Sequence, residues 1–208
     1  MEKSSIAYAL YVVVEKCVHY SYDAFEEMDS FEYMGQTFTG KPLPPDWKLP
    51  KHTAEYTKFP QNDFVPGFWH APFVSKRVKE VLEPILGKES EFRPIGKVLG
   101  KDYYIMNATN VVDCLDKKKS AISYSPSDGR IMGINKAVFL SHRMPNAYLF
   151  KVPEDMSLIY ATDRFVEAVR RYKLTGVSFE PSNHRGVTLR NDVFPDLPLL
   201  ATKSRRSR

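Results

Sequence analysis

The stretch from Phe92 to Val112, FRPIGKVLGKDYYIMNATNVV, decides the fold because two β-prone runs flank the triplet Gly100-Lys101-Asp102. A triplet of Gly and polar residues between two such runs indicates a turn between two strands. Farther along, residues 121–124 and 130–134 flank Ser125-Pro126-Ser127-Asp128-Gly129, where Asp-Gly is a strong hairpin signal. Strands joined by short turns pair antiparallel, so the centre of the chain predicts an antiparallel sheet.

A first helix is predicted immediately before this stretch. Ser75 is a residue type that caps helices, and the apolar residues after it repeat at helical spacing: Val78, Val81, Leu82, Ile85 and Leu86. Pro84 and Gly87 then disturb and end the pattern, because proline lacks a backbone donor and glycine favours a helix stop.

A second helix is predicted near the end of the chain, with Thr162 or Asp163 as its cap. Lys173 in its last turn and Gly176 beyond it are typical of a helix end. Further strands are predicted at residues 148–152, 158–160 and 177–179. Strands outnumber helices and do not alternate with them, which favours α+β over a doubly wound parallel sheet. We therefore expect a mixed, mainly antiparallel sheet with two or three helices.

The N-terminal third of the chain differs from the rest in amino-acid composition. Ile6–Val14, IAYALYVVV, predicts a buried strand, because a signal peptide would need a small-residue cleavage site and the run is too short to cross a membrane. Residues 36–73 contain seven prolines among many aromatics, so this part should be irregular and held onto the core by its aromatic side chains. We predict three segments: a strand and Pro-rich segment packed on the core (1–64), an α+β domain (65–182) and a polar, basic extension (183–208).

Charge and cysteine content narrow the function. The 208 residues carry a formal net charge of +5, but four positive charges lie in residues 203–208, so the remaining chain is nearly neutral. A basic nucleic-acid groove is therefore not indicated, although the tail and Lys117–Lys119 leave nucleic-acid binding open as an alternative. Two cysteines do not form a disulfide framework, and a reducing, cytoplasmic location is expected.

The sequence contains few candidate catalytic, cofactor-binding or metal-binding residues. The sequence has no Gly-rich phosphate loop, dinucleotide fingerprint or nucleophile elbow, and its five histidines are not at metal-ligand spacing, so we expect neither cofactor nor metal. Asp113 and Asp116 could act as an acid/base pair, but capping of a turn before Lys117 explains them more simply. Carboxylates on both sides raise the pKa of Cys114, which favours a buried apolar role over a nucleophilic one.

The triplet Phe68-Trp69-His70 is the most suggestive local cluster in the Pro-rich stretch. It could line a pocket, form an exposed anchor for a partner, or attach its own loop to the core. An enzyme such as a small cytoplasmic hydrolase would have to assemble His70 with Asp113 and Asp116. This hydrolase is the main alternative to a binding protein.

The second half of the chain resembles a known family in the order and spacing of several motifs: Phe92-Arg93-Pro94, Tyr103–Asn107, Val111–Asp116 with Ser120, Tyr148–Pro153, Ile159–Phe165 and Leu174–Pro181. Over about residues 65–182 it is similar to the eleventh immunity-protein family of bacterial polymorphic toxin systems. The resemblance implies a small cytoplasmic protein, encoded beside a toxin, that binds the toxin domain and blocks it without catalysis. It brings no catalytic residues. The residues predicted to contact the toxin come instead from aromatic and strand-end positions: Phe68, Trp69, His70, Asp113, Asp116 and Arg130.

Overall fold

The computed structural model describes residues 7–14, 18–22, 37–49, 52–55, 57–59, 61–68, 71–182 and 189–190. Its strands are β1 (Ala7–Val12), β2 (His19–Tyr22), β3 (His52–Glu55), β4 (Phe64–Phe68), β5 (Ala71–Ser75), β6 (Ser90–Val98), β7 (Lys101–Ala108), β8 (Ala121–Tyr124), β9 (Ile131–Lys136), β10 (Leu149–Val152), β11 (Asp155–Thr162), β12 (Val177–Pro181) and β13 (Leu189–Arg190). The helices are α2 (Lys76–Leu86) and α3 (Asp163–Arg171), with short 3-10 helices η1 (Gly87–Glu89) and η2 (Ser141–Arg143).

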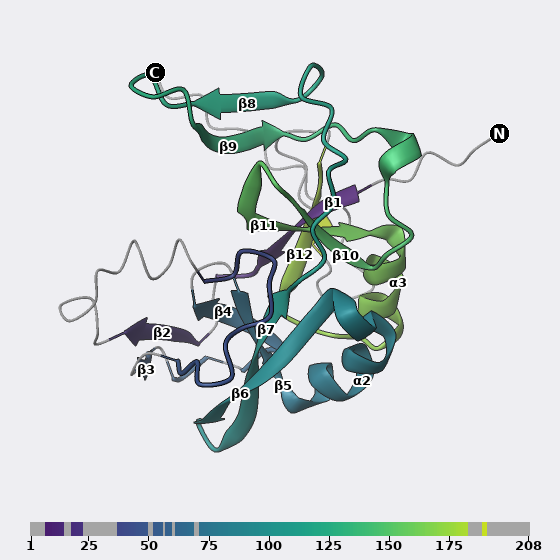
Figure 1. Ribbon diagram of the computed structural model, residues 1–208. Coiled ribbons are helices and arrows are strands. Elements are labelled where there is room, and N and C mark those ends of the chain that lie inside the picture. Colours follow the sequence, from purple (N-terminus) through teal and green to yellow (C-terminus); the bar gives the residue numbers. More distant parts are fainter. Residues whose placement is uncertain are drawn as a thin grey trace, which may run out of the picture.

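Two larger sheets organise the molecule (Figure 1). One has five strands in the order β10-β11-β1-β12-β13, and the other has four in the order β4-β5-β7-β6. The pairs β2-β3 and β8-β9 form two-stranded ribbons. Every pairing between these strands is antiparallel, which confirms the predicted α+β class with a mainly antiparallel sheet.

The apolar N-terminal run forms β1, as predicted, and it lies inside the five-stranded sheet. Ala9 pairs with Tyr160 of β11 on one side, and Leu10 pairs with Phe179 of β12 on the other. Strand β1, from the first predicted segment (1–64), therefore lies in a sheet whose strands β10, β11 and β12 come from the second segment (65–182). The segment boundaries at residues 64 and 182 stay a prediction.

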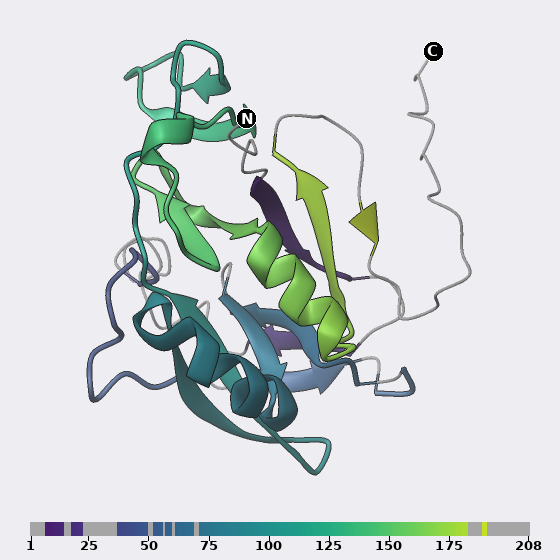
Figure 2. The same cartoon turned by 90° about the vertical axis from the view of Figure 1, so that its right-hand side faces the viewer.

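Side chains alternate across the two sheets and create three apolar clusters, because successive residues of a strand face opposite sides. On one side, α2 and α3 cover the sheets, and Leu82, Phe165 and Phe179 are among the residues buried beneath them (Figure 2). Behind the four-stranded sheet, residues 37–49 cover a cluster that includes Phe73 and Ile105. Behind the five-stranded sheet, residues 111–144 supply most of the cover for the third cluster.

The two helices begin at the predicted residues, but the Thr162 side chain does not cap the second helix, which also ends differently. The Ser75 hydroxyl accepts a hydrogen bond from the Val78 amide, so it caps α2. After α3, Lys173 takes the left-handed conformation (φ 49°), and the Leu174 amide donates to the Val169 carbonyl, as in a Schellman motif. The helix stop is therefore Lys173, and the expectation that Gly176 provides it is wrong.

The β6–β7 hairpin is tighter than predicted. Val98 pairs with Lys101, so the turn consists of Leu99 and Gly100, and Lys101 already belongs to β7. Strand β7 also ends earlier than the predicted Val112. Beyond Ala108 the chain crosses to the five-stranded sheet, where the Val112 amide donates to the Lys151 carbonyl (2.9 Å).

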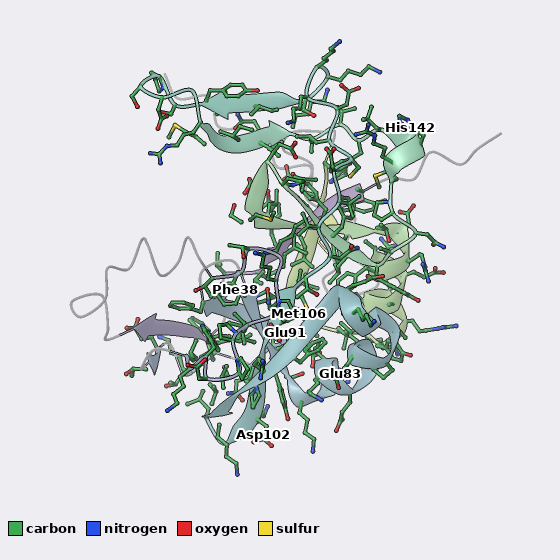
Figure 3. All side chains as sticks on the ribbon, in the orientation of Figure 1. Phe38, Glu83, Glu91, Asp102, Met106 and His142 are labelled. Carbon is green, nitrogen blue, oxygen red and sulfur yellow. The ribbon has the colours of Figure 1, made fainter. Side chains whose placement is uncertain are left out.

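The described part of the Pro-rich stretch is attached to the core by aromatic residues, as expected. Phe38 is buried and meets the ring of Trp47 edge to face, with ring centroids 6.0 Å apart. The Glu91 carboxylate accepts hydrogen bonds from the Leu43 amide and, at 2.8 Å, from the Asn107 side chain. Figure 3 shows Phe38 and Glu91 near the middle of the molecule, where this loop crosses the four-stranded sheet.

Within the described residues, no helix is both long and apolar enough to cross a membrane.

Candidate functional site, a projecting hairpin over the five-stranded sheet

Residues 111–146 form a layer that we call the cap: the β8–β9 hairpin with the segments that connect it to the rest of the chain. The hairpin extends beyond the body of the molecule in Figure 1. Its turn follows the predicted Asp-Gly signal, since the Ser125 amide donates to the Arg130 carbonyl (2.8 Å) and the Gly129 amide to the Ser125 carbonyl (2.9 Å). The Ser125 hydroxyl and the Arg130 amide lower the pKa of Asp128 in this turn.

The underside of the cap packs on the five-stranded sheet. Phe139 lies edge to face against Tyr160 and Phe150, with centroids 5.0 and 5.3 Å away. Ile122 and Ile134, a cross-strand pair of the hairpin, pack against the same cluster. These contacts fix the base of the hairpin and leave its outer part to project.

The outer part exposes apolar side chains that the core does not use. Tyr124 is 53% exposed and Met132 is 70% exposed, one on each strand of the hairpin. Arg130, predicted as a contact residue, lies between them in the turn; its side chain is 78% exposed and pairs with Asp128 at 3.2 Å. Sequence reasoning selected Arg130 but missed Tyr124 and Met132. The available signal was the pair of large apolar residues that flank the Asp-Gly turn.

The two predicted aspartates also belong to the cap, where each carboxylate has partners of its own. The Asp116 carboxylate accepts hydrogen bonds from the amides of Lys118 (3.1 Å) and Lys119 (3.2 Å), so it caps a turn, as the simpler interpretation predicted. Asp113 is exposed and forms an ion pair with Arg143 at 3.2 Å. A role for either aspartate in partner contact stays a prediction.

The predicted cluster Phe68-Trp69-His70 is only partly described by the structure. Phe68 is 5% exposed and lies edge to face against Phe38, so it attaches the Pro-rich loop to the core, one of the alternatives stated for it. Trp69 and His70 lie outside the described residues. Contact of these three residues with a partner stays a prediction, and so does the joining of His70 to the aspartates.

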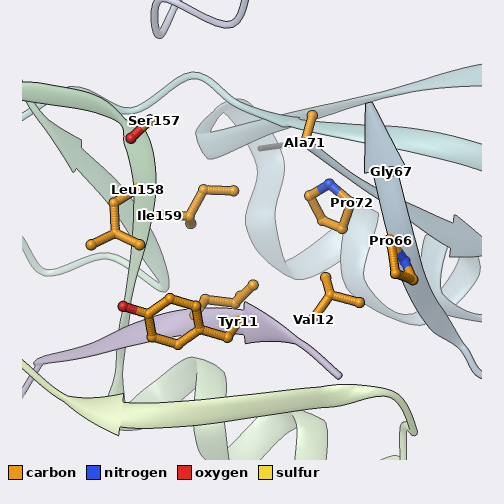
Figure 4. A pocket seen from close by; sticks show the side chains of 10 residues that line it. Tyr11, Val12, Pro66, Gly67, Ala71, Pro72, Ser157, Leu158 and Ile159 are labelled. Atoms are coloured by element: carbon orange, nitrogen blue, oxygen red, sulfur yellow. The ribbon is translucent and has the colours of Figure 1, made fainter. Parts of the chain in front are cut away.

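A pocket of about 230 Å³ lies where β1 and β11 approach the β4–β5 hairpin (Figure 4). Its walls include Pro66, Gly67, Ala71 and Pro72, which flank Phe68-Trp69-His70 in the sequence. Its residues offer a hydroxyl at Ser157 and a phenol at Tyr11 but no charged side chain. The pocket is suited to an apolar group and has no acid/base constellation among these lining residues.

Cys114 is fully buried, and burial, with smaller effects of Asp113 and Glu154, raises the pKa of its thiol to about 12. The predicted buried position of Cys114 is thus confirmed. Among the residues that the structure describes, no group of three or more His, Cys, Asp or Glu is arranged to hold a metal ion.

Cys114 should resist alkylation in the native protein. With a pKa of about 12, only about one thiol in 10⁴ is ionised at pH 8, and the buried sulfur is also inaccessible to the reagent. We expect no iodoacetamide adduct on the Cys114 peptide after one hour in buffer and complete modification in 8 M urea, measured by peptide mass spectrometry. Rapid native labelling at Cys114 would contradict its buried position.

Most of the chain matches a known protein family. The model of the immunity protein family Imm11 matches residues 18–184. The chain belongs to the Imm11 family. The match confirms the resemblance found in the sequence and begins before residue 65, so it includes the whole Pro-rich stretch, residues 36–73. In this Imm11 protein, the cap, the two helices and β2–β12 all lie within the matched residues. No curated protein matches the chain.

Proposed function

We propose that this protein neutralises a cognate bacterial toxin in the cytoplasm by binding its toxic domain, without catalysing a reaction. Membership of an immunity protein family supports toxin neutralisation. The occupied carboxylates of Asp113 and Asp116 support a non-catalytic mechanism, because one is paired with Arg143 and the other bonds turn amides. An enzyme using these groups would first have to break those interactions.

The cap is the proposed contact surface, and the observation that carries this assignment is the exposure of Tyr124 and Met132 on a projecting hairpin. Aromatic, Met and Arg side chains are enriched at protein interfaces, and a few such anchors supply most of the binding energy. Arg130 lies in the turn between these two residues. The body-facing side of the hairpin is already packed, so the two side chains need no rearrangement of the core to meet a partner.

Substitution of the two anchors tests this assignment. Tyr124→Ala and Met132→Ala should each weaken binding to the toxin domain encoded beside the gene about tenfold, close to 1.4 kcal/mol, because each removes apolar area from the interface. The double variant should lose about 100-fold if the sites are independent. Dissociation constants from isothermal titration calorimetry give the result, and protection of cells that express the toxin should fall in the same order.

Leu99→Ala is the matched control. Leu99 is also a large apolar residue at a hairpin turn, 46% exposed. The β6–β7 hairpin that carries it lies at the opposite end of the molecule from the β8–β9 hairpin (Figure 1). Its replacement should leave toxin affinity unchanged within twofold. If the cap variants remain folded and bind as tightly as wild type, the contact surface lies elsewhere; if wild type does not bind the toxin domain, the proposed function is wrong.

A further inference from the structure

Positive charge is concentrated on the cap. Residues 111–146 contain six lysines and arginines but three aspartates, a net charge of +3, whereas the rest of residues 1–202 sum to −2. The near neutrality of the chain without its tail therefore hides two parts of the chain with net charges of opposite sign. The basic one coincides with the projecting hairpin that exposes Tyr124 and Met132.

Two lysines of the cap form no ion pair with the residues that the structure describes. The three aspartates each pair with a neighbouring cation: Asp113 with Arg143, Asp116 with Lys119 and Asp128 with Arg130. The Lys117 ammonium group forms an ion pair with the Glu154 carboxylate, with 2.9 Å between Nζ and Oε1. Lys118 and Lys136, in contrast, are exposed and form no ion pair with any residue that the structure describes.

We infer that the toxin face bound by the cap is acidic, with carboxylates placed to meet Lys118 and Lys136 around the contacts of Tyr124 and Met132. This inference rests on the proposed function and specifies the chemistry of the partner. Burying an ammonium group at an interface without a counter-charge is costly, so a partner that covers these lysines must supply acceptors. Complementary charge at the rim of an interface accelerates association and excludes partners of the same sign.

Charge reversal at the two free lysines tests the inference. The double variant Lys118→Glu/Lys136→Glu should reduce the association rate constant with the toxin domain about 30-fold in 50 mM NaCl, and by less than threefold in 500 mM NaCl, where screening removes long-range attraction. Stopped-flow or biolayer interferometry on the full-length protein supplies both rate constants. The dissociation rate constant should change less than the association rate constant.

The matched control reverses the same charge elsewhere. Lys97 and Lys101 are exposed on the β6–β7 hairpin, near Asp102, which Figure 3 places at the end of the molecule opposite His142 and the cap. Lys97→Glu/Lys101→Glu alters net charge equally and should slow association less than threefold. Equal slowing by both pairs would show an effect of net charge alone and overturn the inference.

The remaining outcomes are separable. If wild type binds the toxin domain and the cap reversal associates at the wild-type rate, the acidic face is wrong while the proposed function stands. If the cap reversal instead abolishes binding of a 20-nucleotide single-stranded RNA probe and leaves toxin association unchanged, the cap serves nucleic acid and the inference is overturned. If wild type does not bind the toxin domain, both the proposed function and the inference fall.

Discussion

Gly176→Ala should lower the free energy of unfolding by about 4 kcal/mol, because the position combines a conformational and a steric constraint. Its φ is +84°, where an L side chain is strained. A Cβ atom there would lie 2.0 Å from the Phe64 carbonyl oxygen and 2.6 Å from Cβ of Asn62. Since the nearest obstacle is backbone, the chain itself would have to move.

That movement would break hydrogen bonds of the loop before β12, one of which ties this loop to β4 of the other sheet. The Phe64 amide donates to the Thr175 carbonyl, and the Val13 amide donates to the Gly176 carbonyl, both at 2.9 Å. Asp63, next to Phe64, accepts bonds from the Thr175 amide (3.1 Å) and the Ser75 hydroxyl (2.9 Å). The start of β4 is therefore held against the loop before β12, and Gly176 is the residue that permits the close approach.

Gly100→Ala separates the two constraints. Gly100 has nearly the same φ, +82°, but a Cβ atom there would meet nothing within 4 Å. Its substitution should cost about 1 kcal/mol, the conformational part alone. Urea unfolding of both variants measures the difference, which we expect to be about 3 kcal/mol. Equal losses would mean that the contact with Phe64 relaxes freely.

The same glycine shows where sequence reasoning succeeds and where it fails. Local signals identified the helices correctly, because Ser75 caps α2 with its own side chain and the spacing of apolar residues defines the buried face. Gly176 follows Lys173 closely enough to suggest a helix stop, yet its real constraint comes from Phe64, 112 residues away in the chain. No local pattern carries that contact.

The sequence does not show which strands pair with each other, for the same reason. The β-prone composition of the run that forms β1 predicts a strand, but not that the strand lies between β11 and β12, more than 140 residues later. At the candidate site, the turn around Asp128 and the capping role of Asp116 were predictable because both are local. The exposure of Tyr124 and Met132 depends on how far the cap extends beyond the sheet beneath it, which only the tertiary structure shows.

Lys151 is the clearest case of a residue whose environment the sequence conceals, and it predicts a pH dependence of stability. It lies in the apolar strand β10 and is 1% exposed. Its Nζ donates to the carbonyls of Phe38 and Met156, both at 2.8 Å, and so fastens the Pro-rich loop to the five-stranded sheet. Burial lowers the pKa of Lys151 to about 8, although the Asp155 carboxylate acts in the opposite direction.

The sign of the effect follows from this lowered pKa. Between pH 8 and pH 10.5 the unfolded chain holds the Lys151 proton more tightly than the folded protein does, so the free energy of unfolding rises with pH. Below pH 8 both states are protonated, and the buried charge costs about 3 kcal/mol, at 1.36 kcal/mol per pKa unit. The neutral amine that forms at higher pH still donates to both carbonyls, so relief of the charge does not release the loop.

Lys151→Met isolates this contribution, because methionine fills a similar volume without an ionisable group. Between pH 8 and pH 9.5 the wild-type free energy of unfolding should rise by about 1 to 2 kcal/mol relative to that of Lys151→Met. Urea titrations at pH 7.5, 8.0, 8.5, 9.0 and 9.5 measure this difference, in which the titration of all other groups cancels. Lys97→Met, at an exposed position, controls for the loss of one lysine and should follow wild type across the series. A difference that stays constant with pH would show that Lys151 keeps its ordinary pKa and is hydrated, which would contradict its burial between Phe38 and Met156.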